Sequence, residues 1–196
     1  MRKLRRLGIL IVVAILTYTM TGCGEVRKAE NSVNNMFKAF QNLDFEAAKE
    51  YIDLEEVEEQ DDINAKAIME NLFQELEYQI ISSEKIDKDT VNVKVKITAV
   101  DMKPIFRDFF VDYIAHAFSY ALSGDEMTEE EQEAKMQEIL LQSIKDRGSQ
   151  TVTNEVVLEV NRQGKDWKVE SSDTFVNALL GDFEKVVEEI QNSLDS

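Results

Sequence analysis

The stretch Val91-Asn92-Val93-Lys94-Val95-Lys96-Ile97-Thr98-Ala99 (residues 91–99) alternates apolar and polar side chains without interruption. A period of two residues is the pattern of a β-strand with one face in a core and the other in water. Residues 156–160 alternate in the same way, and the alternation resumes at Trp167 and Val169 after a turn at 163–165. A further strand begins at Tyr78 and is followed by a turn at 87–89. The sequence therefore predicts at least four antiparallel strands, arranged as two hairpins.

Segments with apolar residues at three- and four-residue steps surround and separate the hairpins, and this spacing predicts helices. The helices are expected at residues 26–43, 44–52, 63–76, 105–122, 128–146 and 174–194, the last as one helix or as a pair interrupted at Gly181. Asp44, Thr128 with Glu131, and Asp173 are candidate N-caps. The order of elements predicts an α+β fold: a curved antiparallel sheet packed with N-terminal helices, a helical insertion between the hairpins, and a C-terminal helix.

The first 22 residues differ in character from the rest of the chain. They hold four basic residues and no acidic one, and an apolar run of 14 residues extends from Leu7 to Met20. As a helix this run measures about 21 Å, short of the ~30 Å hydrocarbon core of a bilayer, so a permanent span is not expected. The pattern is typical of a secretory signal peptide.

The residues Met20-Thr21-Gly22-Cys23 resemble the bacterial lipobox, with methionine where leucine is usual, and Cys23 is the only cysteine. The alternative is a buried cysteine after an uncleaved anchor. The resemblance implies that residues 1–22 are removed and that Cys23 carries a diacylglycerol, with acyl chains such as palmitate. Residues 23–196 would then form one domain, anchored to the extracytoplasmic face of the bacterial cell membrane.

The acidic balance excludes one class of partner. The full chain of 196 residues has a net charge of −17; residues 1–22 contain four of its 22 basic and none of its 39 acidic residues, so their removal leaves −21. Nucleic acid is not an expected partner, because its binding draws on lysine and arginine. Anionic headgroups would also repel this surface, so we expect the body to stand off the membrane.

Two segments carry a family resemblance. Residues 35–51 resemble the opening of cystatin-like, nuclear-transport-factor-two-like domains, and Gly164-Lys165-Asp166-Trp167-Lys168-Val169 resembles a strand frequent in that superfamily. The chain is also similar to lipoproteins of Gram-positive bacteria that contain domains of unknown function. The resemblance implies a cone in which helices pack into a curved sheet. Fold analogy alone does not imply an enzyme, and no catalytic residue of that superfamily is assigned here.

Asp108, Asp112 and His116 form the best candidate constellation, since residues four apart share a helix face. They could act as an acid–base couple or contribute metal ligands. The alternative is a polar surface stripe in which His116 pairs with Asp112. The acidic segments 53–62 and 125–133 do not match a calcium-loop pattern, so no metal site is assigned.

The aromatic-rich segment 105–122 leaves three interpretations open: the lining of a ligand pocket, a partner-binding surface, or burial between the sheet and other helices. The sequence contains no Gly-rich phosphate loop, G-x-S-x-G elbow or H-E-x-x-H motif, and it has a single histidine. These absences make a serine hydrolase or a zinc protease improbable.

Taken together, these features favour a lipid-anchored extracytoplasmic binding or interaction module without catalytic residues or a cofactor. Its expected partners are the membrane, through the acyl chains on Cys23, and an unidentified small ligand or envelope protein. Two alternatives remain open. One is a small pocket enzyme that uses Asp112 and His116 as an acid–base couple, and the other is an accessory subunit of an envelope transporter or sensor.

Overall fold

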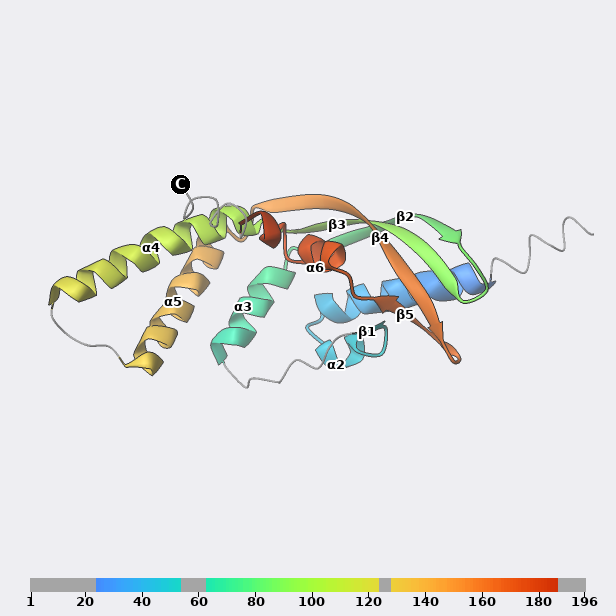
Figure 1. Ribbon diagram of the computed structural model, residues 1–196, viewed down its shortest axis with the longest axis horizontal. Helices are drawn as coiled ribbons and strands as arrows, with labels where there is room; N and C mark the ends of the chain where they lie inside the picture. The colour runs from blue at the N-terminus through green and yellow to red at the C-terminus, as the bar shows by residue number, and fades with distance from the viewer. Residues whose placement is uncertain (1–23, 54–62, 124–127, 187–196) are drawn as a thin grey trace, which may run out of the picture.

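Five strands form one open sheet in the order β1-β5-β4-β3-β2. The computed structural model describes residues 24–53, 63–123 and 128–186, so the predicted signal peptide and Cys23 lie outside the described part (Figure 1). The strands are β1 (Ile52–Asp53), β2 (Glu77–Lys85), β3 (Thr90–Val100), β4 (Thr151–Gln163) and β5 (Asp166–Glu170). β2, β3, β4 and β5 pair antiparallel, whereas β1 pairs parallel with β5. The predicted α+β class and both hairpins are confirmed.

Helices precede, interrupt and follow the sheet. They are an N-terminal helix (residues 24–41), α2 (Phe45–Ala48), α3 (Ile63–Phe73), α4 (Met102–Ser123), α5 (Glu129–Arg147) and α6 (Asp173–Leu179), followed by a helical turn at 183–186. Two predicted caps are confirmed. The Asp44 carboxylate accepts a hydrogen bond from the backbone N–H of Ala47 at 3.0 Å, and Thr128 forms a capping box with Glu131.

Two local predictions were wrong. The second helix ends at Ala48 instead of Ile52, because Ile52 is paired with Val169 of β5. The last helix is capped by Ser172 instead of Asp173. Ser172 has an extended backbone (φ −124°, ψ 152°) and its hydroxyl accepts a hydrogen bond from the N–H of Phe175, which is the geometry of an N-cap.

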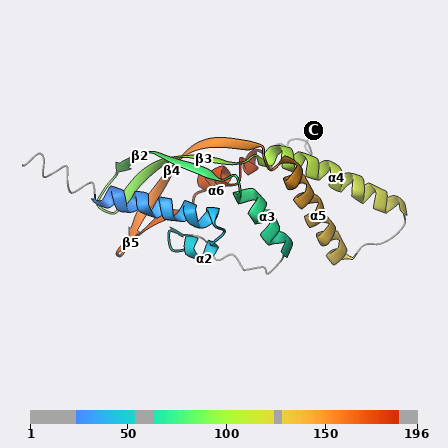
Figure 2. The same cartoon turned by 180° about the vertical axis from the view of Figure 1, so that it is seen from behind.

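The sheet arches over the N-terminal helix, α2, α3 and α6, which lie on its inner side (Figures 1 and 2). The alternating residues predicted to face the core do so: Val91, Val93, Val95, Ile97, Ala99, Val156, Leu158, Val160, Trp167 and Val169 are all buried. The opposite face of the sheet is mostly polar, with Val157 as an exposed apolar side chain. There the Lys94 ammonium donates to the Glu155 carboxylate at 2.7 Å, and this contact holds the pKa of Glu155 below its usual value.

Aromatic side chains fill the space between the N-terminal helix and the sheet. The fully buried ring of Phe37 stacks on Tyr78 of β2, with ring centroids 4.4 Å apart, and meets Phe175 of α6 edge-on at 6.1 Å. The Tyr78 hydroxyl donates to the amide oxygen of Asn34 at 3.0 Å, and burial raises the pKa of this phenol. Buried core side chains therefore fill the space between the helix and the sheet.

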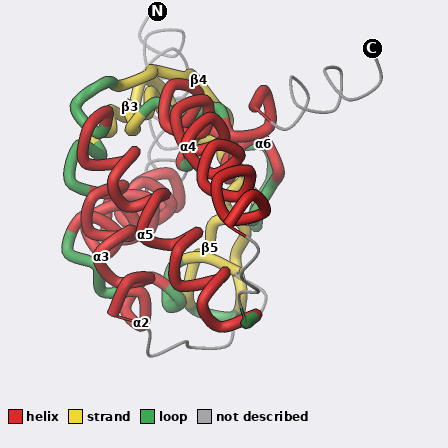
Figure 3. Tube along the Cα trace, turned by 90° about the vertical axis from the view of Figure 1, so that its left-hand side faces the viewer, coloured by secondary structure: helices red, strands yellow, loops and turns green. Residues whose placement is uncertain are grey.

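The two helices of the insertion, α4 and α5, extend beyond the end of the sheet (Figure 1). Viewed from that end, α4, α5 and α3 lie in front of the arched strands (Figure 3). β3 enters α4 through Asp101 alone, and Thr151 opens β4 directly opposite Val100. A β-strand rises about 3.3 Å and an α-helix about 1.5 Å per residue. The tip of α4 therefore lies tens of ångströms from the β2–β3 turn.

Gly181 holds the base of this extension against the C-terminal segment. Its carbonyl accepts a hydrogen bond from the backbone N–H of Met102 at 3.1 Å, and its φ is +58°. A Cβ atom at this position would lie 1.7 Å from the carbonyl oxygen of Val100. Only glycine can supply both the left-handed backbone and the close approach.

Replacing Gly181 with alanine should therefore destabilise the fold by about 2 kcal/mol or more, through the left-handed backbone and the clash together. Gly164→Ala is a matched control, because Gly164 also has a positive φ of +67° but no atom within 4 Å of the added Cβ. That variant should lose only about 1 kcal/mol. Urea unfolding of both variants measures the difference, and equal losses would show that the approach to Val100 is unimportant.

Candidate functional site

The base of the α4–α5 extension is built from apolar side chains contributed by three helices. Val100, Met102, Ile105 and Ile144 form a small buried cluster. Partly buried residues of α3, α4 and α5 pack against it: Ile68, Leu72, Phe106 and Leu140. A backbone hydrogen bond also joins the end of β3 to the start of β4 at this point: the N–H of Asp101 donates to the carbonyl of Gln150 at 2.8 Å. The extension is therefore fixed to the sheet at its base.

Beyond the base, one face of α4 is left exposed by the residues that the structure describes. Val111, Ile114, Phe118 and Leu122, here called the apolar stripe, retain 62%, 63%, 66% and 73% of their accessible surface. Their spacing of three, four and four residues places them on one side of the helix. At 100° per residue, Phe118 lies about 180° around α4 from the buried Phe109. Ile114, Phe118 and Leu122 thus face away from the packed side of the helix, while Val111 lies at the edge of the hollow between α4 and α5.

This exposure divides the apolar residues of the aromatic-rich helix into a buried group and an exposed group. Burial between sheet and helices holds for Met102, Ile105 and Phe109, the buried residues of α4. Burial was wrong for the four residues of the apolar stripe. Four large apolar side chains exposed in a row form a contiguous patch, and patches of this kind commonly mark interaction sites. The sequence held a signal for this, since the apolar residues of α4 cover too broad an arc for one contact surface.

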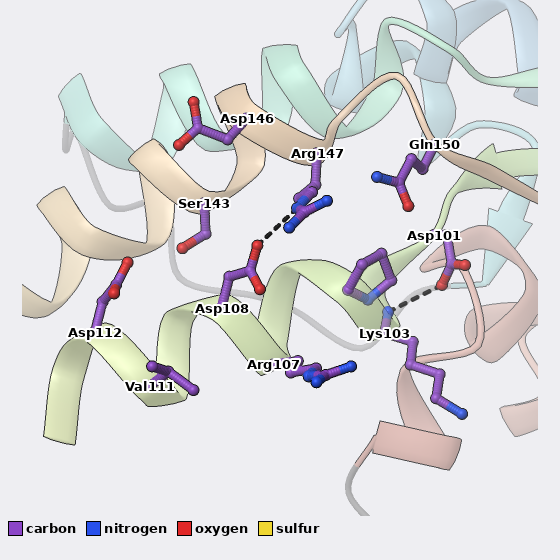
Figure 4. Close-up of a pocket in the computed structure, with 11 residues that line it drawn as sticks. Asp101, Lys103, Arg107, Asp108, Val111, Asp112, Ser143, Asp146, Arg147 and Gln150 are labelled. Carbon is purple, nitrogen blue, oxygen red and sulfur yellow. Dashed lines mark hydrogen bonds and ion pairs between the residues drawn. The ribbon is translucent and has the colours of Figure 1, made fainter. Parts of the chain in front are cut away.

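A charged hollow of about 680 Å³ lies where α4 and α5 meet. Figure 4 shows Asp108 of α4 pointing toward Arg147 of α5, with a carboxylate oxygen 2.6 Å from the guanidinium Nε. Asp112, Asp146 and Arg107 also line the hollow. Because Arg147 is paired with Asp108, it is already partly neutralised. Arg147 was not identified from the sequence, since it is 39 residues from its partner.

The predicted constellation is divided by the structure. Asp108 and Asp112 line the hollow, whereas His116 is not among the residues that line it. His116 is partly buried, stacks on Tyr120 with ring centroids 6.2 Å apart, and lies close enough to Glu138 of α5 to contribute to lowering its pKa. The main cause of that lowering is the hydrogen bond from Lys135. Within the described residues, no hydrogen bond or ion pair joins Asp112 to His116.

The structure offers no specific support for metal chemistry at this site. In the part of the chain that it describes, no three His, Cys, Asp or Glu side chains are grouped so as to hold a metal ion. Residues 54–62 and 124–127, which make up most of one acidic segment and part of the other, lie outside that part. Among the helices that can be described, none is long and apolar enough to cross a membrane.

A second hollow, of about 650 Å³, lies between the N-terminal helix and β5. Its lining is mixed and includes Lys28, Lys165, Glu50, Tyr51 and Trp167. The buried hydroxyl of Ser32 donates to the carbonyl of Trp167 and ties the helix to the strand. This contact fixes the middle of the N-terminal helix beside β5.

Comparison with known proteins gives one weak structural likeness. No protein-family model matches the sequence, and no curated protein is similar to it. A crystal structure of a candidate lipoprotein, ycdA, from Bacillus subtilis aligns with a TM-score of 0.43 and 16% identity, over 63% of this chain. The chain spans only 38% of that structure's length. The likeness to cystatin-like domains therefore stays a prediction.

The Asp108–Arg147 pair should contribute modestly to the attachment of α5. A double-mutant cycle with Asp108→Ala and Arg147→Ala should give a coupling energy of about 0.5–1 kcal/mol, because both side chains are partly exposed to solvent. A parallel cycle on the more exposed pair Lys94–Glu155 should give less than about 0.5 kcal/mol. Urea unfolding gives both values, and an absence of coupling between Asp108 and Arg147 would contradict the assignment.

Proposed function

We propose that the protein is a lipid-anchored extracytoplasmic interaction module that binds another envelope protein through the apolar stripe of α4. The observation that carries this proposal is the exposure of Val111, Ile114, Phe118 and Leu122 on a helix that projects from the fold. The filled interior between the N-terminal helix and the sheet favours a surface site over a ligand bound inside the cone. No specific observation favours the alternative of an enzyme based on Asp112 and His116.

The net charge of the mature chain and the position of the apolar stripe favour one class of partner. A mature chain with a net charge of −21 repels a second copy of itself, so self-association through the stripe is disfavoured. The stripe lies at the end of the molecule opposite the start of the N-terminal helix (Figure 1), so an anchor at Cys23 would hold it away from the membrane. The partner that fits is a protein with an apolar contact surface and a neutral or basic rim.

The anchor is tested by Cys23→Ala. If the lipobox resemblance holds, the native protein should fractionate with the membrane and its N-terminus should be a diacylated cysteine by mass spectrometry. The variant should lose the acyl chains and leave the membrane fraction, or keep its signal peptide uncleaved. A native protein with a free Cys23 thiol and an intact residue 1–22 segment would contradict the proposal.

The stripe is tested by photocrosslinking in intact cells. A photoreactive amino acid at Ile114 should give one discrete adduct, and the Phe118→Glu substitution should remove it, because a charge in an apolar contact must be desolvated. The matched control is Ser119→Glu, one residue along α4 and also exposed. The adduct partner, once purified, should bind the isolated protein and lose affinity with Phe118→Glu. An adduct of twice the mass of this chain, or no adduct, would contradict an envelope-protein partner.

Both glutamate variants should unfold at the same urea concentration as the native chain, within about 0.5 kcal/mol in free energy, since Phe118 is 66% exposed. This measurement separates loss of binding from loss of folding.

A further inference from the structure

Three surface segments meet at the end of the molecule opposite the α4 tip. They are the start of the N-terminal helix, the β2–β3 turn (residues 86–89) and the β4–β5 turn (residues 163–165), here called the anchor end (Figures 1 and 2). Glu25 forms an ion pair with Lys85, and Asp89 lies 3.9 Å from the guanidinium of Arg162. These contacts fix the three segments relative to one another.

The anchor end is joined to Cys23 without a spacer. The N-terminal helix begins at residue 24, so one peptide unit of about 3.8 Å separates its first Cα from that of Cys23. A lipid-anchored body usually gains distance and orientational freedom from a flexible linker. Here a helix packed against the sheet begins at the next residue, so the acyl chains would hold the anchor end at the headgroups.

The charges of the anchor end differ from those of the whole chain. Its basic side chains reach into solvent: Lys88 is 86% exposed, and Arg27, Lys28 and Lys165 are exposed as well. Its acidic residues are balanced by these bases. Glu25 is paired with Lys85, and Asp89 contacts both Lys88 and Arg162. The exposed Asp87 and Asp166 stand beside Lys88 and Lys165, so this end is close to neutral. The net charge of −21 is therefore carried mainly by other parts of the molecule, including the exposed acids Glu129, Glu130 and Glu131 at the start of α5.

An apolar side chain stands at the same end. Ile86 occupies the β2–β3 turn and is 52% exposed, although turns of this kind are normally polar. Its backbone N–H is paired with the carbonyl of Thr90, so the turn holds the side chain in place. An exposed isoleucine next to exposed lysines is the combination that suits the boundary between headgroups and acyl chains.

We propose that the anchor end is a membrane-contacting surface for anionic phospholipid headgroups, which sets the protein end-on to the bilayer with α4 and α5 pointing away. The proposal rests on the lipid anchor of the proposed function. Ile86 enters the interfacial layer, Lys88, Arg27 and Lys165 meet the phosphates, and the acidic remainder is repelled. The repulsion between the acidic surface and anionic headgroups, expected from the sequence, then orients the protein but does not separate its anchor end from the membrane.

The orientation can be measured on the full acylated chain in vesicles of phosphatidylcholine with phosphatidylglycerol. Because Cys23 is the only cysteine and would be blocked by its thioether, one introduced cysteine can be labelled selectively. Fluorophores at Lys88→Cys and Lys165→Cys should be quenched several-fold more by a headgroup-linked quencher than fluorophores at Ser119→Cys on α4 and Glu133→Cys on α5. Labelled Cys23→Ala chains in solution give the unquenched reference.

The outcomes separate this proposal from the proposed function. A chain that does not float with the vesicles, because Cys23 carries no acyl chain, would overturn both. A chain that floats but is quenched equally at all four positions, or more strongly at 119 and 133, would overturn the orientation alone.

Substitutions at the anchor end test its contribution directly. Ile86→Ser combined with Lys165→Glu should reduce quenching at position 88 several-fold and raise it at position 119, while flotation is kept by the acyl chains. Lys145→Glu, an equal charge change on the exposed last turn of α5, is the control and should change neither value. An unchanged pattern in the double variant would show that Ile86 and the basic residues do not set the orientation.

Discussion

The pairing of β3 with β4 is the constraint on which the rest of the structure depends. Eleven consecutive residue pairs, from Thr90–Asn161 to Val100–Thr151, join the two strands in an uninterrupted register. A shift by one residue would turn the buried valines of β3 into solvent, so the register is strongly specified. At one end of this ladder lie the turns beside the N-terminal helix, and at the other end α4 begins and α5 ends. The ladder therefore separates the two proposed surfaces by at least its own length.

Much of this architecture could be predicted from the sequence because it is encoded by local period and local caps. The alternation of residues 91–99 predicts β3, and the Thr128–Glu131 box predicts the start of α5. β1 could not be predicted, since two residues carry no period and Ile52 becomes a strand only by pairing with Val169. The exposure of Phe118 could not be predicted either, because the apolar pattern of a helix does not show whether a neighbouring element covers it.

The relative positions of Asp108, Asp112 and His116 on α4 were also only partly predictable from the sequence. Residues four apart share a face, but each step of four advances about 40° around the axis, so Asp108 and His116 differ by about 80°. That rotation is enough to leave Asp108 and Asp112 in the hollow shared with Arg147, while His116 stacks on Tyr120 and lies near Glu138. The sequence could place the three residues on one helix but could not show which of them would share the hollow with Arg147.

The two proposed surfaces lie at the two ends of the molecule. Between them, Phe37, Tyr78 and Phe175 fill the space that in a hollow cone would receive a ligand. Large apolar side chains left in solvent cost free energy and solubility unless something covers them. They occur here on the free face of α4 and, as Ile86, at the opposite end, and Val157 and Ile81 of the sheet are exposed between them. A rigid body with one such surface at each end is suited to holding a partner at a set distance from a membrane, and the unbroken β3–β4 ladder supplies the rigidity.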